Sequence, residues 1–175
     1  MEAVFTNEEN TQISWTNDQG QVWSVPYPLV DGQIPNQVQE WLDEGNAISP
    51  YDAPLPTSDD VNSERDRRLK LFTFANKVYD FDADSQQNIA GAYSLALAAV
   101  INGAQPNDLR WIDSDQDFAW IAHDNSLVTM DAQTCLAFGQ AAASWKADHI
   151  RTARSIKDLA PIPIDFAEDS RWPTA

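Results

Sequence analysis

The chain has 175 residues, of which 27 are Asp or Glu and 11 are Lys or Arg, so its formal net charge is -16. Because nucleic-acid phosphates and anionic membrane surfaces are bound through basic residues, this charge argues against both as partners. No apolar run reaches the ~20 residues that a membrane-spanning helix needs, and the first ten residues lack the pattern of a signal peptide. We therefore expect no nucleic acid, no membrane insertion, and folding in a cytoplasm.

The basic residues are unevenly distributed along the chain. Residues 1–57 contain nine acids and no Lys or Arg, and all 11 bases follow. The change coincides with "SPYDAPLPTSDD", whose prolines prevent a helix and favour an extended linker. We therefore predict an N-terminal hairpin-helix docking module over residues 1–50, a Pro-rich linker over 51–57, an α+β domain over 58–159 and an extended C-terminal tail over 160–175.

The N-terminal module is predicted from two short patterns. In "TQISWTNDQGQVWSVPY", apolar residues alternate on both sides of the turn "NDQG", which indicates a β-hairpin. In "IPNQVQEWLDEGN", Pro35 near the start and Gly45 near the end indicate a short helix. Fifty residues bury little surface, so we expect this module to lean on another chain or on the main domain.

The main domain alternates helical and strand patterns. A helix begins near Ser58 as its N-cap, the hairpin "LFTFANKVYDF" follows, and a second helix begins near Asp84. This second helix, "DSQQNIAGAYSLALAAVINGA", is apolar on most sides, which predicts a central place in the core. Three strands, "LRWI", "FAWIA" and "LVTM", precede a long helix that Asp131 caps. The predicted fold class is α+β, a small antiparallel sheet packed with two or three helices, the last one long, plus the N-terminal hairpin-helix appendage.

One acidic stretch resembles a metal-binding loop. Asp113, Asp115 and Asp117 match positions one, three and five of a calcium loop, and Asp124 falls at position twelve. However, Phe118 stands where the sharp turn of such a loop needs glycine, and the twelfth residue should be a bidentate Glu. We interpret the stretch as a polar hairpin turn and predict no metal.

The chain has few nucleophilic residues that a catalytic site could use. His123, Asp124 and Cys135 could act as base, orienting group and nucleophile, but an alanine-rich helix in an acidic chain favours a buried thiol. His149 lies on an apolar helical stripe, where a histidine is typically a hydrogen-bonded core or interface residue. Two His and one Cys cannot form a zinc set without carboxylates. We predict no catalytic residue and no cofactor.

Two further segments suggest contact with partners. The cluster "ERDRR", Glu64 to Arg68, indicates a solvated helix face with ion pairs, or alternatively a docking patch for an acidic neighbour such as another copy. Large apolar residues spread along an extended proline-rich tail suit pockets on a partner. The predicted partner-contact residues are Trp15, Trp23, Trp41, Ile162, Ile164, Phe166 and Trp172.

Residues 62–158 resemble a domain of unknown function found in small proteins of tailed bacteriophages, commonly encoded beside tail-fibre or tail-tip components. The matching segments include "NSERDRRL", "FTF", "NIAGAYSLALAA", "DLRW" and the run from "DFAWIAHDNS" to "SWKADHI". The segment "WLDEGNAISPYDAP" also resembles one common in phage tail-fibre assembly and fibre-neighbour proteins.

The resemblance implies a role in the virion and no established chemistry. The expected function is a non-enzymatic structural component of a tailed-phage virion, in the tail-tip, baseplate or tail-fibre region, joining or supporting fibre proteins. The expected partners are other phage tail or fibre proteins and further copies of the chain within the particle, after synthesis in the host cytoplasm. The alternatives are a tail-fibre assembly chaperone and, ranked lowest, a host-surface hydrolase.

Overall fold

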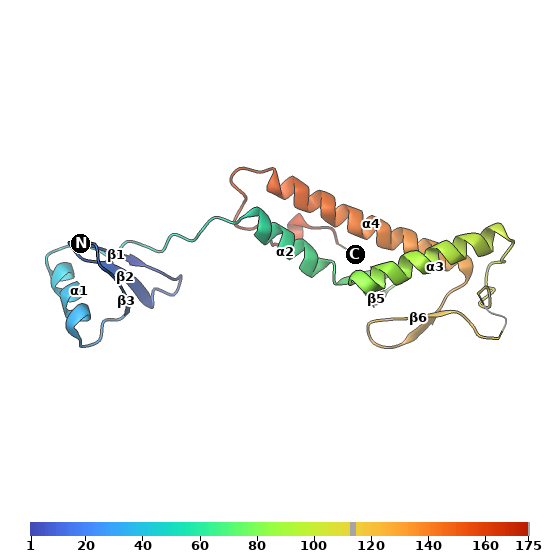
Figure 1. Ribbon diagram of the computed structural model, residues 1–175, viewed down its shortest axis with the longest axis horizontal. Helices are drawn as coiled ribbons and strands as arrows, with labels where there is room; N and C mark the ends of the chain where they lie inside the picture. Colours follow the sequence, from blue (N-terminus) through green and yellow to red (C-terminus); the bar gives the residue numbers. More distant parts are fainter. Residues whose placement is uncertain (113–114, 175) are drawn as a thin grey trace. The chain divides into compact units, whose positions relative to one another are not determined.

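The computed structural model describes residues 1–112 and 115–174, and the chain falls into two units, Met1–Pro54 and Leu55–Ala175 (Figure 1). The division lies inside the predicted linker, where residues 51–57 form neither helix nor strand. Each unit has buried residues of its own. The fold class is α+β, as the sequence predicts.

The first unit is a three-stranded antiparallel sheet, in the order β1-β2-β3, together with one helix. The strands are β1 (Glu2–Phe5), β2 (Gln12–Thr16) and β3 (Val22–Pro26), and the helix is α1 (Gln33–Asp43). The hairpin and the helix are predicted, but β1 is not. Trp15 of β2 and Trp41 of α1 meet edge to face with ring centroids 5.2 Å apart, inside a core of Ala3, Ile13, Trp15, Val25, Val38 and Trp41. The unit therefore has a core without help from elsewhere.

The long helix α4 (Ala132–Lys157) organises the second unit. Its N-terminal half packs against α3 (Ala83–Ile101), and its C-terminal half packs against α2 (Ser58–Arg68) (Figure 1). Close approach of α3 and α4 depends on Gly139, because a Cβ atom there would lie 2.8 Å from Tyr93 Cδ2. The absence of a side chain at this position thus lets the two helices meet.

Two small antiparallel hairpins complete the second unit. One joins β4 (Leu71–Phe74) to β5 (Lys77–Asp80), and the other joins β6 (Ala119–Ile121) to β7 (Leu127–Thr129). The His123 backbone N–H donates to the Val78 carbonyl at 2.8 Å and so links the hairpins. Aromatic rings from both hairpins pack against Phe138 of α4, which makes this cluster the largest core of the unit.

Several predicted details need correction. Of the three strands expected in this region, "LRWI" is not a strand, because residues 109–112 are irregular apart from a bond from Phe118 N–H to the Leu109 carbonyl. The N-caps of α2 and α3 are Thr57 and Asp82 rather than Ser58 and Asp84, since their side chains accept the first free backbone N–H groups. The predicted cap of α4, Asp131, is confirmed.

The C-terminal tail is not extended. Residues 160–174 form turns and the short 3-10 helix η1 (Asp169–Arg171). Trp172, which follows η1, is buried against Val61 of α2 and Ala153 and Ile156 of α4. The tail therefore belongs to the core of the second unit. None of the helices in the described part of the chain has the length and apolar content needed to cross a membrane.

Candidate functional site

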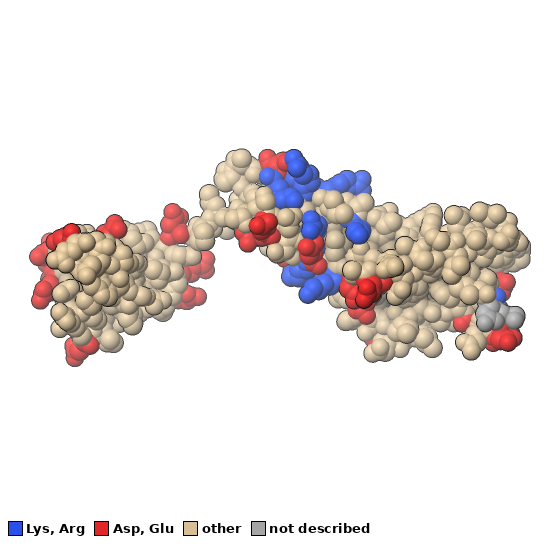
Figure 2. All heavy atoms as spheres, viewed as in Figure 1, with Lys and Arg blue, Asp and Glu red and all other residues tan. Residues whose placement is uncertain are grey.

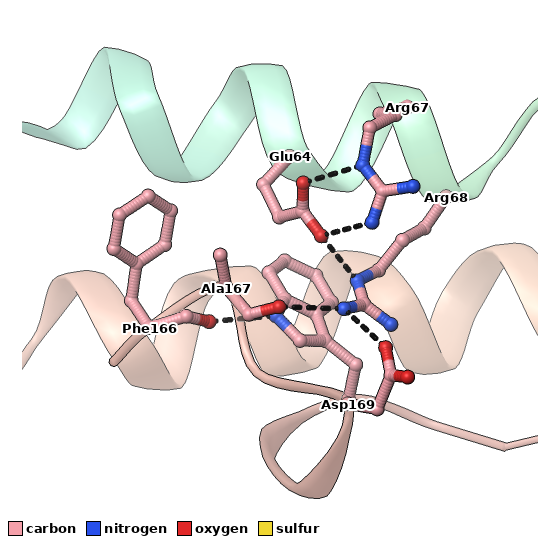
Figure 3. A network of polar contacts seen from close by, with 7 residues as sticks. Glu64, Arg67, Arg68, Phe166, Ala167 and Asp169 are labelled. Carbon is pink, nitrogen blue, oxygen red and sulfur yellow. Dashed lines mark hydrogen bonds and ion pairs between the residues drawn. The ribbon is translucent and has the colours of Figure 1, made fainter. Parts of the chain in front are cut away.

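Two members of the "ERDRR" cluster are largely buried, Glu64 and Arg68, and Arg68 holds the tail, whereas Arg67 faces solvent (Figure 3). Glu64 accepts a hydrogen bond from Arg68 Nε at 2.6 Å and two from Arg67, at 2.7 and 2.6 Å. Arg68 Nη2 then donates to the Ala167 carbonyl and to Asp169, both at 2.8 Å. Hydrogen bonds from Arg67 are the main cause that lowers the pKa of Glu64. Arg68 hydrogen-bonds the C-terminal tail of the same chain. It therefore belongs neither to a solvated helix face nor to a docking patch for an acidic neighbour.

An aromatic stack lies beside this network. Arg68 lies over the Trp172 ring at 5.2 Å from its centroid, and Trp172 Nε1 donates to the Phe166 carbonyl at 2.8 Å. The His149 ring stacks on Trp172 and is fully buried. Since His149 Nδ1 lies 2.9 Å from the Trp145 carbonyl, Nδ1 carries the proton and Nε2 is left without a partner. Burial is the main cause that lowers the pKa of His149.

The predicted partner-contact residues are mostly inside the molecule. Trp15, Trp41 and Trp172 are buried in the cores of their own units, and Trp23, Ile162 and Phe166 are half-buried against those cores. Only Ile164 is well exposed, at 75%. The prediction took large apolar residues in a proline-rich context as contacts, but turns bring the tail back onto α2 and α4, so these side chains have partners within the chain.

The residues weighed for catalysis lie in separate surroundings. Cys135 is 1% exposed inside the core, and burial raises the pKa of its thiol to about 11. His123 is exposed, and its Nδ1 lies 2.7 Å from Asp80 of β5. Asp124 pairs with Lys77 at 2.9 Å instead of orienting a histidine. His123 and Asp124 thus pair with residues other than each other, and Cys135 is enclosed in the core.

The calcium-loop pattern is only partly inside the described residues. Asp113 lies outside them, so its position in the pattern is not described. Asp117 pairs with Arg110 at 3.0 Å, and Asp124 belongs to the Lys77 ion pair. Among residues 1–112 and 115–174, no group of three or more His, Cys, Asp or Glu side chains is placed to hold a metal ion.

The most unusual surface is the outward side of α3. The helix was expected to lie centrally, yet only Ile89, Ala92 and Ala96 are buried. Its opposite side exposes Gln87, Ala90, Gly91, Ser94, Leu97, Ala98 and Ile101, which recur at spacings of three and four and so share one face. We call these seven residues the α3 face. Residues 85–107 contain no Asp, Glu, Lys or Arg, although 22% of the chain is charged.

The α3 face has exposed large side chains and a hollow on each side. Leu97 is 41% exposed and Ile101 75%. A hollow on one side lies between Ala90, Ser94 and the α4 residue Ala143. A second hollow runs beside Gly91 toward Ile112 and Trp120. In Figure 2, Lys and Arg side chains gather over α2 and the C-terminal half of α4, whereas the region of α3 is tan beyond its acidic N-terminal end.

Sequence reasoning missed this face although part of the signal is visible. An apolar helix is ordinarily read as central, and the alanines of α3 encourage that interpretation. The distinguishing features were the complete lack of charge over residues 85–107 and the exposed glycine at position 91. The structure adds that α4 covers one side of α3. No further helix in the described part of the second unit packs on the other side.

By its structure the chain is an α+β protein of two units, and one long helix organises the second unit. The chain belongs to the family described as Domain of unknown function (DUF4376), whose profile matches residues 52–169. The match ends at residue 169, so it includes Ile162 and Phe166 of the tail but not Trp172. No curated protein and no solved structure is detectably similar to the chain.

Proposed function

We propose that this chain is a non-enzymatic structural component of a tailed-phage virion, in the tail-tip, baseplate or tail-fibre region, where it joins or supports fibre proteins. Its partners in this role are other tail or fibre proteins and further copies of the chain. The role begins with synthesis in the host cytoplasm and ends in the particle. The proposal rests on the sequence resemblance described above together with the surfaces of the second unit.

The α3 face is the observation that carries the proposal. Exposed contiguous apolar surface on a protein typically marks a contact with another protein. Here that surface lies on a regular helix whose other side is fixed against α4, so it is preformed and changes little on binding. A preformed face suits a permanent joint, and the separate N-terminal unit offers a second attachment point.

The runner-up function is a tail-fibre assembly chaperone. The same apolar face could hold an immature fibre protein and release it before the particle is complete. The acidic N-terminal segment, with nine acids and no Lys or Arg over residues 1–57, favours solubility of such a complex. A host-surface hydrolase ranks lowest, because Cys135 and His123 interact with separate surroundings.

Quantitative mass spectrometry of purified particles tests the proposal. We expect peptides of this chain at a fixed ratio to the major tail protein in every preparation. Particles made without the gene serve as the control, and these should lack fibres or tail-tip parts. A chain found in the lysate on a fibre protein, yet absent from purified particles, would indicate the chaperone. Degradation of host-surface polymer by the purified chain would indicate the hydrolase.

A further inference from the structure

We infer that the α3 face pairs with the α3 face of a second copy of this chain, antiparallel and about a two-fold axis near Ser94. This inference names one surface and one partner, and it holds whatever particle the protein belongs to.

Gly91 lies in the middle of α3, and nothing in the described part of the chain requires a glycine there. A Cβ atom at this position would meet no heavy atom of the described residues within 4 Å, and its backbone is not in the left-handed region. Glycine inside a helix is less stable than alanine because the unfolded chain loses more freedom on folding. Gly139 differs, since Tyr93 of the same chain fills the space above it. A close approach to Gly91 by another molecule gives the glycine a physical reason.

The α3 face is complementary to itself in one orientation. Large side chains, Leu97 and Ile101, lie toward its C-terminal end, and small or flexible ones, Gly91 and Gln87, lie toward its N-terminal end. A two-fold axis through Ser94 brings together positions equally distant from it in sequence. Leu97 then lies opposite Gly91, and Ile101 opposite Gln87. Each large side chain meets a gap or a flexible partner, as close packing between helices requires.

A parallel arrangement lacks this fit. It places Leu97 opposite Leu97 and Gly91 opposite Gly91, so large groups collide at one end while a gap remains at the other. Closed two-fold pairs are also the commonest form of self-association, because one patch then serves both copies. The hollows beside Gly91 and beside Ser94 provide room for side chains of the second copy.

Charge explains why this face, and no charged one, accepts a second copy. Each chain carries a net charge of -16, so two copies repel one another over most of their surfaces. The α3 face has no charged residue to oppose contact, and burying it costs no desolvation of ions.

Sedimentation equilibrium of the full-length chain over a range of concentrations tests the inference. We expect the wild type to dimerise and Gly91→Gln to associate at least about tenfold more weakly. The glutamine has free space within its own chain, so its thermal midpoint should stay equal to the wild type or rise. The matched control is Leu127→Gln on β7, which removes a leucine that is 71% exposed and should leave dimerisation unchanged.

Three results would overturn the inference. A wild type that stays monomeric means that something else covers the α3 face, such as the N-terminal unit or another protein. Gly91→Gln dimers as strong as the wild type place the contact elsewhere. Loss of the dimer in Leu127→Gln alone assigns it to the β6–β7 hairpin. Since all three are measured on the purified chain, none depends on whether the protein is found in a virion.

Discussion

At the scale of single residues, Arg67 and Arg68 are neighbours in sequence with different surroundings. The Arg68 side chain is 12% exposed and binds Glu64, the Ala167 carbonyl and Asp169. The Arg67 side chain is 63% exposed, and among the described residues its hydrogen-bond partner is Glu64. Because Arg68 is largely buried and Arg67 is exposed, removing Arg68 should lower the free energy of unfolding more than removing Arg67.

Arg68→Ala should lower the free energy of unfolding of the second unit by about 1–3 kcal/mol, because the Glu64 carboxylate, 10% exposed, loses one of its donors and Trp172 loses the cation over its ring. Arg67→Ala is the matched control, and its cost should stay within about 1 kcal/mol. Urea denaturation followed by far-UV circular dichroism measures both. Equal effects of the two substitutions would show that the network does not hold the tail.

His149 should make the second unit less stable as the pH falls. Burial lowers the pKa of His149 below its ordinary value near 6.5. As the pH falls through about 6.5, His149 is protonated in the unfolded chain but not yet in the folded chain. The free energy of unfolding therefore decreases below that pH, by at most about 1.4 kcal/mol per pH unit. Unfolding at about pH 7.5 and about pH 5.5 measures the loss, in a range where carboxylates with ordinary or lowered pKa values stay charged.

His149→Asn is the control for this titration. The asparagine keeps an N–H donor for the Trp145 carbonyl but does not titrate. Its free energy of unfolding should fall less than that of the wild type between the two pH values. The same pH dependence in both proteins would assign the loss to other groups.

Residue-level predictions succeed where one local signal stands alone and fail where several similar residues compete for the same role. Asp131 caps α4 as predicted, and Cys135 is a buried thiol as interpreted. By contrast, the caps Thr57 and Asp82 lie one and two residues before the predicted Ser58 and Asp84. Several Ser, Thr and Asp residues stand at each helix start, and the sequence alone does not rank them.

At the scale of elements, the C-terminal tail illustrates what a pattern cannot reveal. Proline content and scattered apolar residues predict an extended chain that reaches a partner. The fold instead turns the tail back so that Trp172 covers Val61 and Ile156. The contact with Val61 joins positions more than a hundred residues apart, and no local periodicity encodes it. The α3 helix shows the complementary failure, since its apolar character on most sides predicts a central place in the core, yet one face is exposed.

Cutting the chain after Leu159 should unfold the C-terminal half of the second unit or leave it frayed. The truncation removes Trp172 and Phe166 from the cluster and uncovers Val61, Ile156 and Arg68. Large-to-small changes of a buried tryptophan alone cost about 3–5 kcal/mol. Hydrogen exchange of α2 and of the end of α4 measures the loss of protection. The control is Ile164→Ala, because Ile164 is exposed. A truncated chain with native protection would restore the view of the tail as a free arm.

At the scale of the whole molecule, the linker divides two units that each have their own core. The sequence predicts the place of this division from its prolines and from the onset of basic residues. It underestimates the first unit, because β1 and the Trp15–Trp41 contact give 54 residues a core of their own. The two units should therefore unfold separately.

Trp15→Ala tests this independence. Trp15 is fully buried in the first unit, and its removal should cost about 3–5 kcal/mol, enough to unfold so small a unit. Amide resonances of residues 1–50 should collapse to unfolded positions in an NMR spectrum, while those of 58–174 stay in place. Collapse of both sets would mean that the units stabilise one another.

Salt should strengthen pairing through the α3 face. Raising the ionic strength from about 0.05 M to about 0.5 M screens the repulsion between two acidic chains and leaves an uncharged contact intact. Sedimentation equilibrium at the two salt concentrations measures the change in the association constant. Weaker association at high salt would point to a contact between the acidic first unit and a basic surface.

Disulfide trapping at Ser94 tests the central claim, the two-fold pairing of α3, most directly. In Ser94→Cys the two introduced thiols face one another across the axis, while native Cys135 is buried and its pKa is raised to about 11, so it does not compete. Mild oxidation should convert the full-length variant to a covalent dimer in high yield. Leu127→Cys, on β7, should stay monomeric under the same conditions. No dimer from Ser94→Cys, or equal yields from both variants, would contradict the account.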